Sequence, residues 1–288
     1  MAPEPIRSTA RLRRLGRALR QARHDAELTL EEAGRRLERS APSLSKIETG
    51  RVAVAPRDLP RILEVYDVPA QLREPLIQLA RDALRRGWWD HYGTILSQDY
   101  LDYLSLETDA AQALTFEPVL IPGLLQSRDY ARAIIANVPD AGQSLHVSDL
   151  LAVHATRQEA LTRRSPAPLR LHAVITEGAL RQQIGGPEVW RDQMRHLDHI
   201  AHLDNVDVRI LPFTAPTTAS ANGPFLILRF PDLIDLDQVL IENPTGGLYL
   251  EEEKEVRRYR TLFSALENAA LPPEATCDVI ARLIEDQP

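Results

Sequence analysis

A short segment from Ser40 to Gly50 carries several side chains that can form hydrogen bonds to groups outside the chain. Ser40 is a typical N-terminal cap of a helix, and Leu44 with Ile47 supplies an apolar face about two turns long. The other positions of this helix lie off the apolar face: Ala41, Pro42, Ser43, Ser45 and Lys46. Hydroxyl groups and an ammonium group on an exposed face are typical of a recognition surface, which needs neighbouring elements that hold it rigidly.

A second predicted helix lies directly before this segment. Thr29-Leu30-Glu31-Glu32 has the form of a capping box, in which the Thr29 hydroxyl and the Glu32 carboxylate satisfy each other's free amides. Gly34 is the close-approach position, where a side chain would push the following helix away. The two helices have the spacing of a helix-turn-helix. In this motif the second helix protrudes from the surface, so its N-terminal half can enter a major groove of DNA.

The run from Leu28 to Gly50 resembles the XRE/Cro-type helix-turn-helix of bacterial and phage repressors. The ending Ile-Glu-x-Gly at residues 47–50 is its most specific part. In that family an arginine late in the preceding helix pairs with this glutamate, and the matching residues are Arg23 and Glu48. Such a pair would tie the recognition helix to the rest of the domain and orient the arginine toward a phosphate.

The resemblance also implies which residues meet double-stranded DNA. Base-edge contacts are expected from residues 41–46: Lys46 can donate to guanine O6 and N7, Ser43 can donate or accept, and Ala41 or Pro42 can pack on a thymine methyl group. Ser45 belongs to the same exposed set. The residues expected to contact phosphates are Arg20, Arg23, Arg51 and Arg57.

Two positions depart from the family pattern. Leu30 stands where many relatives place a polar residue that contacts a phosphate, so fewer direct contacts to DNA are expected from this position. Glu38 stands where the turn usually carries glycine, and a left-handed conformation there costs a non-glycine residue about 1 kcal/mol or more.

Three further helices are expected around this motif. Leucine and alanine recur at helical spacing in residues 12–26, and similar patterns cover residues 59–66 and 72–84. None of the five helices is long enough to be stable alone. Residues 11–86 are therefore predicted to form one compact all-α domain, preceded by a flexible arm over residues 1–10, and the resemblance to the XRE family implies that this domain has a lambda-repressor-like fold.

Charge divides the chain into a basic and an acidic part. Residues 1–86 hold 18 Arg and Lys against 12 Asp and Glu, a net charge of +6, whereas residues 87–288 hold 16 against 29, a net charge of −13. A basic module followed by an acidic one indicates that only the first meets a polyanion.

Residues 87–288 are predicted to form a mixed α+β domain that begins at Gly87-Trp88-Trp89-Asp90. Trp88, Trp89 and Tyr92 could seal the two modules together or face a partner, and the seal is favoured because aromatic side chains bury large areas where domains meet. Helical patterns cover residues 99–114, 127–137, 148–164, 187–203 and 253–268. Short apolar or β-branched runs predict strands at residues 169–176, 206–211, 225–230 and 238–242.

This second part resembles the C-terminal domain of an actinobacterial family of XRE regulators described as antitoxin-like, the Scr type. The matching stretches are residues 87–90, 116–118, 121–126, 130–131, 185–187, 211–213, 223–230 and 247–251. The resemblance implies a transcriptional regulator that is often encoded beside a small partner protein.

An enzymatic role is not expected. The best metal-ligating candidates are His196, His199 and His202, with Asp192 one turn earlier, but the three histidines cannot converge because six residues turn about 240° around a helix. The sequence has no nucleophile elbow, P-loop or dinucleotide fingerprint. We therefore expect no catalytic residue, no cofactor and no metal.

The cellular setting follows from what the chain contains. Its one cysteine, Cys277, cannot form an internal disulfide, and no apolar run approaches the roughly 18 to 20 residues that span a bilayer. We expect a cytoplasmic protein that does not enter a membrane.

Two modes of control remain open for the acidic domain. It binds a small protein partner, which opposite charge would favour, or it binds a small-molecule effector that shifts DNA affinity. In both cases we expect a homodimer, because one short recognition helix contacts too few base pairs for useful specificity.

Overall fold

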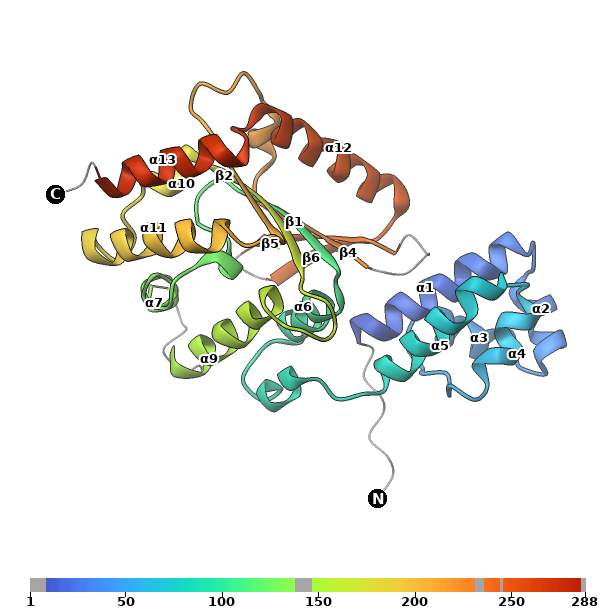
Figure 1. Ribbon diagram of the computed structural model, residues 1–288. Helices are drawn as coiled ribbons and strands as arrows, with labels where there is room; N and C mark the ends of the chain where they lie inside the picture. The colour runs from blue at the N-terminus through green and yellow to red at the C-terminus, as the bar shows by residue number, and fades with distance from the viewer. Residues whose placement is uncertain (1–8, 138–146, 231–235, 244–245, 286–288) are drawn as a thin grey trace. The chain divides into compact units, whose positions relative to one another are not determined.

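The computed structural model describes residues 9–137, 147–230, 236–243 and 246–285 (Figure 1). The chain divides into two compact units. The first comprises Met1–Gly93, Leu101–Leu106 and Phe230–Leu236, and the second comprises Thr94–Tyr100, Glu107–Arg229 and Asp237–Pro288. The boundary after residue 86 stays a prediction, as does the flexible arm, of which residues 1–8 lie outside the described ranges.

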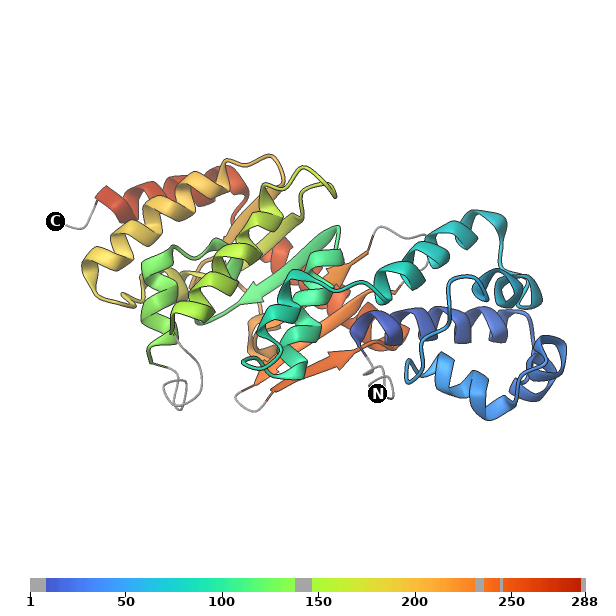
Figure 2. The same cartoon turned by 90° about the horizontal axis from the view of Figure 1, so that it is seen from below.

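The first unit is helical, as predicted, and its helices share one apolar core. Within residues 9–93 they are α1 (Ala10–Asp25), α2 (Leu30–Leu37), α3 (Ala41–Glu48), α4 (Leu59–Val65) and α5 (Ala70–Ala83). Each helix contributes to a core in which Leu19, Leu59 and Leu63 are fully buried. In Figure 2 these helices, coloured blue to cyan, group together.

An aromatic cluster follows α5 in a turn of 3-10 helix, Trp88–Tyr92. The rings of Trp88 and Trp89 meet edge to face with centroids 5.9 Å apart. The guanidinium of Arg11 lies 4.9 Å from the Trp89 ring centroid, so Trp89 packs against α1 within the first unit. Its role as a seal between the two modules stays a prediction.

The second unit combines helices with a mixed sheet, which confirms the predicted α+β class. The helices are α7 (Arg128–Ile135), α9 (Val147–Gln158), α10 (Glu177–Arg181), α11 (Pro187–Ala201), α12 (Glu253–Ala269) and α13 (Pro273–Glu285). A further helix, α6 (Gln98–Asp109), is divided between the units, with Leu101–Leu106 counted in the first.

The described strands form one six-stranded sheet with the order β3-β2-β1-β4-β5-β6. The strands are β1 (Gln112–Glu117), β2 (Arg170–Thr176), β3 (Val206–Leu211), β4 (Phe225–Arg229), β5 (Gln238–Asn243) and β6 (Gly246–Leu250). Strands β1, β2 and β3 are parallel, whereas β4, β5 and β6 join as antiparallel neighbours. The carboxyl ends of the three parallel strands therefore meet at one edge of the sheet.

Helix α12 packs on one face of this sheet. Its residues Phe263 and Leu266 are buried, and the helix contacts β1, β3, β4 and β5. The Phe225 ring of β4 is the centre of the contact, with centroids 5.9 Å from Phe116, 5.1 Å from Tyr259 and 6.5 Å from Phe263.

The sequence interpretation was wrong at the centre of the sheet. The helix predicted over residues 99–114 ends at Asp109, and residues 112–117 form β1. Residues 113–116 are all buried because β1 lies between β2 and β4 and is covered on both faces. Such a strand lacks the alternation of apolar and polar residues that marks a half-exposed strand, so the sequence pattern does not distinguish its first residues from the end of the predicted helix. Strand β6 and helix α13 were also missed.

Candidate nucleic-acid interface

Helix α3 presents its N-terminal half to the outside of the first unit. The Ser43 amide donates to the Ser40 hydroxyl over 3.3 Å, which confirms Ser40 as the cap. Leu44 and Ile47 are buried, as predicted, whereas Pro42 and Lys46 are exposed. The remaining candidates for base contacts, Ala41, Ser43 and Ser45, are half-buried.

The preceding helix, α2, begins with the predicted capping box. The Thr29 amide donates to Glu32 Oε2 over 2.9 Å, and the Glu32 amide donates to the Thr29 hydroxyl over 3.2 Å. The hydrogen bond from the Thr29 amide is the main reason that the pKa of Glu32 lies below its usual value. Leu30, the departure from the family pattern, is half-buried against the core.

The turn between α2 and α3 is tight. Glu38 has φ 54° and ψ 37°, so the left-handed conformation expected there is present in a non-glycine residue. A Cβ at Gly34 would lie 2.6 Å from the carbonyl oxygen of Arg39 but 3.5 Å from the amide of Ala41. Gly34 is a close-approach position, but its nearest neighbour is the turn and not α3 itself.

A second close approach, which the sequence analysis missed, joins α1 to α3. A Cβ at Gly16 would lie 2.6 Å from the carbonyl oxygen of Ile47 and 2.7 Å from that of Glu48. Gly50, with φ 66°, sits equally close to the backbone of Arg13. The C-terminal end of α3 therefore rests directly on the α1 backbone. An isolated glycine inside a strong helical pattern is the signal that could have identified Gly16.

The predicted pair of Arg23 and Glu48 is present and bidentate. Arg23 Nε donates to Glu48 Oε1 over 2.8 Å and Nη2 to Oε2 over 2.9 Å, and both side chains are nearly buried. The Tyr66 hydroxyl donates to Glu48 Oε1 over 2.9 Å, and Arg23 Nη1 donates to the Leu28 carbonyl over 2.7 Å. The hydrogen bond to Glu48 raises the pKa of Arg23, and burial raises the pKa of Tyr66. The pair locks α3 to α1; a phosphate contact by Arg23 stays a prediction.

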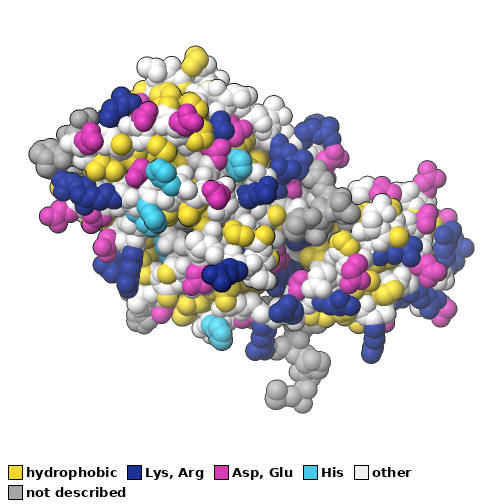
Figure 3. Space-filling model, in the orientation of Figure 1, with side chains coloured by type: hydrophobic (Ala, Val, Ile, Leu, Met, Phe, Trp, Pro, Cys, Tyr) yellow, Lys and Arg dark blue, Asp and Glu magenta, His cyan; other side chains and the backbone are white. Residues whose placement is uncertain are grey.

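The other arginines expected to meet phosphates lie at the surface of the first unit. Arg20 on α1, Arg51 after α3 and Arg57 before α4 are exposed. The Arg57 side chain is 89 % exposed and its Nε lies 3.7 Å from Asp58 Oδ1. On the face shown in Figure 3, Lys and Arg side chains of this unit, at the right, are interspersed with Asp and Glu.

Several arginines of α1 are used inside the first unit. Arg13 Nη2 donates to Asp102 Oδ2 over 2.7 Å, and the other oxygen of Asp102 accepts from the Ala10 amide over 3.1 Å. Arg14 stacks on the Phe230 ring, with its guanidinium carbon 3.7 Å from the ring centroid. Net charge therefore overstates the positive charge that this unit offers to DNA. No spacing in the sequence indicates that Asp102 caps α1.

Among the described residues, His196, His199, His202 and Asp192 do not include three whose ligand atoms converge. His202 Nδ1 lies 2.7 Å from the backbone oxygen of Asp198, and Asp192 accepts from Arg195 over 3.2 Å. Burial, followed by the nearby His199, lowers the pKa of His196. Each of these groups therefore has a local environment of its own on α11.

A different cluster of possible ligands joins β2, β3 and α12. His172 Nδ1 lies 3.9 Å from Asp207 Oδ2 and 3.8 Å from Glu267 Oε1. Arg209 Nη2 lies 2.9 Å from Asp207 Oδ2 and 3.7 Å from Glu267 Oε1, so a guanidinium already supplies the positive charge for both carboxylates. The cluster is an ion-pair network that sequence spacing could not reveal, because its members come from three separate elements.

Across the described residues, no helix combines the length and apolar character needed to cross a membrane.

Comparisons with known families agree with both units. Residues 14–76 match the family described as a helix-turn-helix domain, and residues 100–282 match the domain of unknown function DUF5753. No curated protein and no solved structure matches the chain. The first match confirms the predicted helix-turn-helix domain. Because the second covers more than half of the sequence, the chain belongs to the DUF5753 family, with a helix-turn-helix domain at its N-terminal end.

Proposed function

We propose that the protein is a sequence-specific DNA-binding transcriptional regulator that acts by binding and not by catalysis. The observation that carries the proposal is the outer face of α3, on which Pro42 and Lys46 are exposed, held in place by the buried pair of Arg23 and Glu48. A helix fixed at its C-terminal end and free at its N-terminal end can place that end in a major groove.

Within this proposal Lys46 and Ser43 read base edges. Lys46 is exposed and can donate to guanine, and Ser43 lies in the first turn of the same helix. Ala41, Pro42 and Ser45 complete the surface that faces the groove. The exposed guanidiniums of Arg20, Arg51 and Arg57 bind phosphates, which sets the register without reading sequence.

The protein binds its operator as a homodimer. Helix α3 has eight residues, which limits one copy to a few base pairs. Two copies related by a two-fold axis read half-sites about one helical turn apart and double the contact.

Control by a small protein partner, in the manner of an antitoxin, is the mode that the charge distribution favours. The net charge of −13 over residues 87–288 suits a basic partner, since opposite charge accelerates encounter. The resemblance of this region to the Scr-type regulators supports the same assignment. A small basic protein encoded nearby should co-purify with the regulator and change its affinity for DNA.

The decisive experiment uses the two lysines of the chain, Lys46 and Lys254. A duplex that the protein selects from a random pool is bound at saturation, exposed amines are acetylated, and the extent at each lysine is measured by mass spectrometry. We expect the selected duplex to protect Lys46, whereas Lys254, exposed on α12, serves as the internal control. Equal acetylation of Lys46 with and without DNA would contradict the proposal.

Variants separate base reading from phosphate binding. Lys46→Ala should lose discrimination between the selected duplex and random DNA, and Lys254→Ala should bind like the wild type. Arg51→Ala should weaken binding to both sequences alike and reduce the salt dependence by about one counterion. An equal loss on both sequences for Lys46→Ala would remove Lys46 from sequence recognition.

A further inference from the structure

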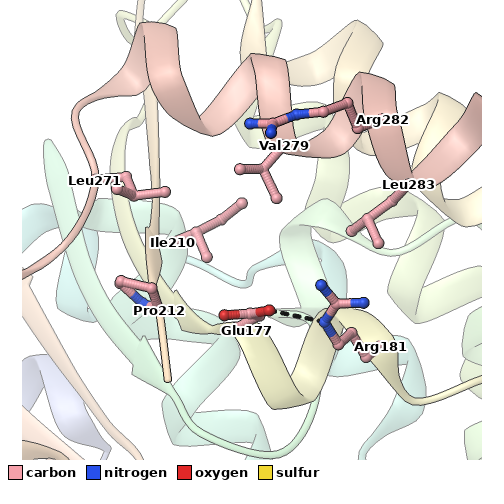
Figure 4. Close-up of a pocket in the computed structure, with 8 residues that line it drawn as sticks. All are labelled: Glu177, Arg181, Ile210, Pro212, Leu271, Val279, Arg282 and Leu283. Atoms are coloured by element: carbon pink, nitrogen blue, oxygen red, sulfur yellow. Dashed lines mark hydrogen bonds and ion pairs between the residues drawn. The ribbon is translucent and has the colours of Figure 1, made fainter. Parts of the chain in front are cut away.

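A cavity of about 320 Å³ lies in the second unit, between α10 and α13 (Figure 4). Strand β2 ends at Thr176, directly before α10, and β3 ends at Leu211, directly before Pro212. The cavity therefore sits at the carboxyl ends of two parallel strands. Ligands of open α/β sheets characteristically bind beyond this edge of the sheet. Its residues are Glu177, Arg181, Ile210, Pro212, Leu271, Val279, Arg282 and Leu283.

The lining has an apolar part and a charged part. Ile210 and Pro212 come from the end of β3, Leu271 from the segment before α13, and Val279 with Leu283 from α13 itself (Figure 4). Two arginines and one glutamate complete the lining, which leaves a net charge of one positive unit in a part of the chain that is acidic as a whole.

The glutamate is already paired. Glu177 accepts a hydrogen bond from Arg181 Nε over 2.8 Å and another from the Phe213 amide over 3.1 Å. Burial raises the pKa of Glu177, but these two hydrogen bonds outweigh it and hold the pKa below its usual value. The carboxylate is therefore ionised and its charge is compensated before any ligand arrives.

The two guanidiniums keep free donors. Arg181 uses its Nε for Glu177, and Arg282 uses its Nε for the Asp278 carbonyl at 3.1 Å. Among the described residues, the terminal nitrogens of both side chains make no hydrogen bond or ion pair. Paired terminal N–H groups of arginine match the two oxygens of a carboxylate.

We propose that this cavity binds a small amphipathic carboxylate. The carboxylate group bonds to Arg181 and Arg282, and the hydrocarbon part packs against Ile210, Val279 and Leu283. The volume lies at the lower end of the range for small-molecule sites, which limits the ligand to a short chain or a single ring. All the residues that line the site belong to the second unit.

The test is titration calorimetry of the full chain with octanoate, with hexanoate and 1-octanol as matched probes. Octanoate should bind, and each added methylene should raise affinity about fourfold. 1-Octanol should bind at least tenfold more weakly, because it lacks the charged group that the arginines recognise. Absence of octanoate binding, or equal affinity for 1-octanol, would overturn the proposal.

Variants locate the site. Arg181→Gln and Arg282→Gln should each weaken octanoate binding about tenfold or more, whereas Arg164→Gln, an exposed arginine outside the cavity, should bind normally. Val279→Phe keeps both charges but fills the cavity, so it should abolish octanoate binding while leaving the melting temperature near that of the wild type. Inorganic phosphate that binds as tightly as octanoate, or variants that all bind octanoate normally, would refute the assignment.

Discussion

Two buried arginine–glutamate pairs, one in each unit, differ more in their surroundings than in their geometry. Arg23 and Glu48 join α1 to α3 with hydrogen bonds of 2.8 and 2.9 Å, and Arg157 and Glu107 join α9 to α6 with two of 2.8 Å. The Arg23 and Glu48 side chains are 7 % and 4 % exposed, and those of Arg157 and Glu107 are 11 % and 4 % exposed. Both are therefore closed, bidentate contacts shielded from water.

The neighbours of the two pairs give them different tasks. Around the pair of Arg23 and Glu48 the additional partners are the Leu28 carbonyl and the Tyr66 hydroxyl, and His24 Nε2 lies 3.4 Å from Arg23 Nη2. Around Arg157 lie two titratable groups whose pKa values are shifted: Glu242, a surface residue whose pKa partial desolvation of the carboxylate raises, and His154, whose pKa burial and then Arg157 lower to about 4. The first pair is a fixed clamp on α3. The second belongs to a cluster whose charges change with pH.

Breaking the clamp should give the largest effect. Glu48→Gln leaves Arg23 buried without its counter-charge, which should lower the free energy of unfolding of the first unit by about 3 kcal/mol. Urea unfolding measures the loss, and affinity for the selected duplex should fall with it because α3 is no longer held on α1. Unchanged stability and affinity would show that the pair does not hold the recognition helix.

The corresponding change at Arg157 should act mainly on α9 and on the end of α6 that belongs to the second unit, and only weakly on DNA binding. Arg157→Gln leaves the Glu107 carboxylate buried without its counter-charge. Because this carboxylate can take up a proton, we expect the free energy of unfolding to fall by a smaller amount, about 2 kcal/mol. Hydrogen exchange should accelerate in peptides from α6 and α9 and stay unchanged in α2 and α3. Faster exchange in α3, or a strongly weakened affinity for the selected duplex, would contradict this prediction.

The same comparison explains what the sequence could predict. The pair of Arg23 and Glu48 was predicted because both residues belong to a motif whose helices follow one another along the chain. The pair of Arg157 and Glu107 was not, because α6 and α9 are brought together by tertiary packing that leaves no periodic pattern. For the same reason Arg282, on a helix that was missed, could not be assigned to a cavity.

The pH dependence of the second unit should reflect Glu117, at the end of β1. Burial, and then the nearby Glu242, raises the pKa of Glu117 to about 8, well above its usual 4.5. The folded protein holds a proton that the unfolded chain has lost, so this contribution to stability is complete below pH 4.5 and lost as the pH rises through 8. Glu242 acts in the same direction.

Glu117→Gln should therefore raise the melting temperature of the second unit by a few degrees at pH 9 and much less at pH 5. His154 has the opposite sign: its stabilising contribution is present above pH 6.5 and is lost as the pH falls toward 4. The variant should thus leave a profile that rises between pH 4 and 6.5 and declines less above it, because Glu242 remains. Melting temperatures recorded from pH 4 to 9 measure both the rise at low pH and the decline at high pH. Parallel profiles for variant and wild type would exclude Glu117 as a cause of the decline.

A third arginine–glutamate pair completes the comparison, because it lies in water. Arg61 Nη2 lies 3.0 Å from Glu38 Oε1, and the two side chains are 55 % and 80 % exposed. Exposed pairs contribute about 0 to 1 kcal/mol, and Arg61→Ala should lower the free energy of unfolding by no more than that.

Glu38, however, holds φ at 54°, a conformation that glycine adopts without strain. Glu38→Gly loses the ion pair and gains freedom in the unfolded chain, yet relief of the left-handed strain should leave the first unit about 0.5 kcal/mol more stable. Urea unfolding of both variants separates the two contributions, because both lose the ion pair; a Glu38→Gly variant that is less stable than Arg61→Ala would show that the added freedom of the unfolded chain outweighs the relief of backbone strain.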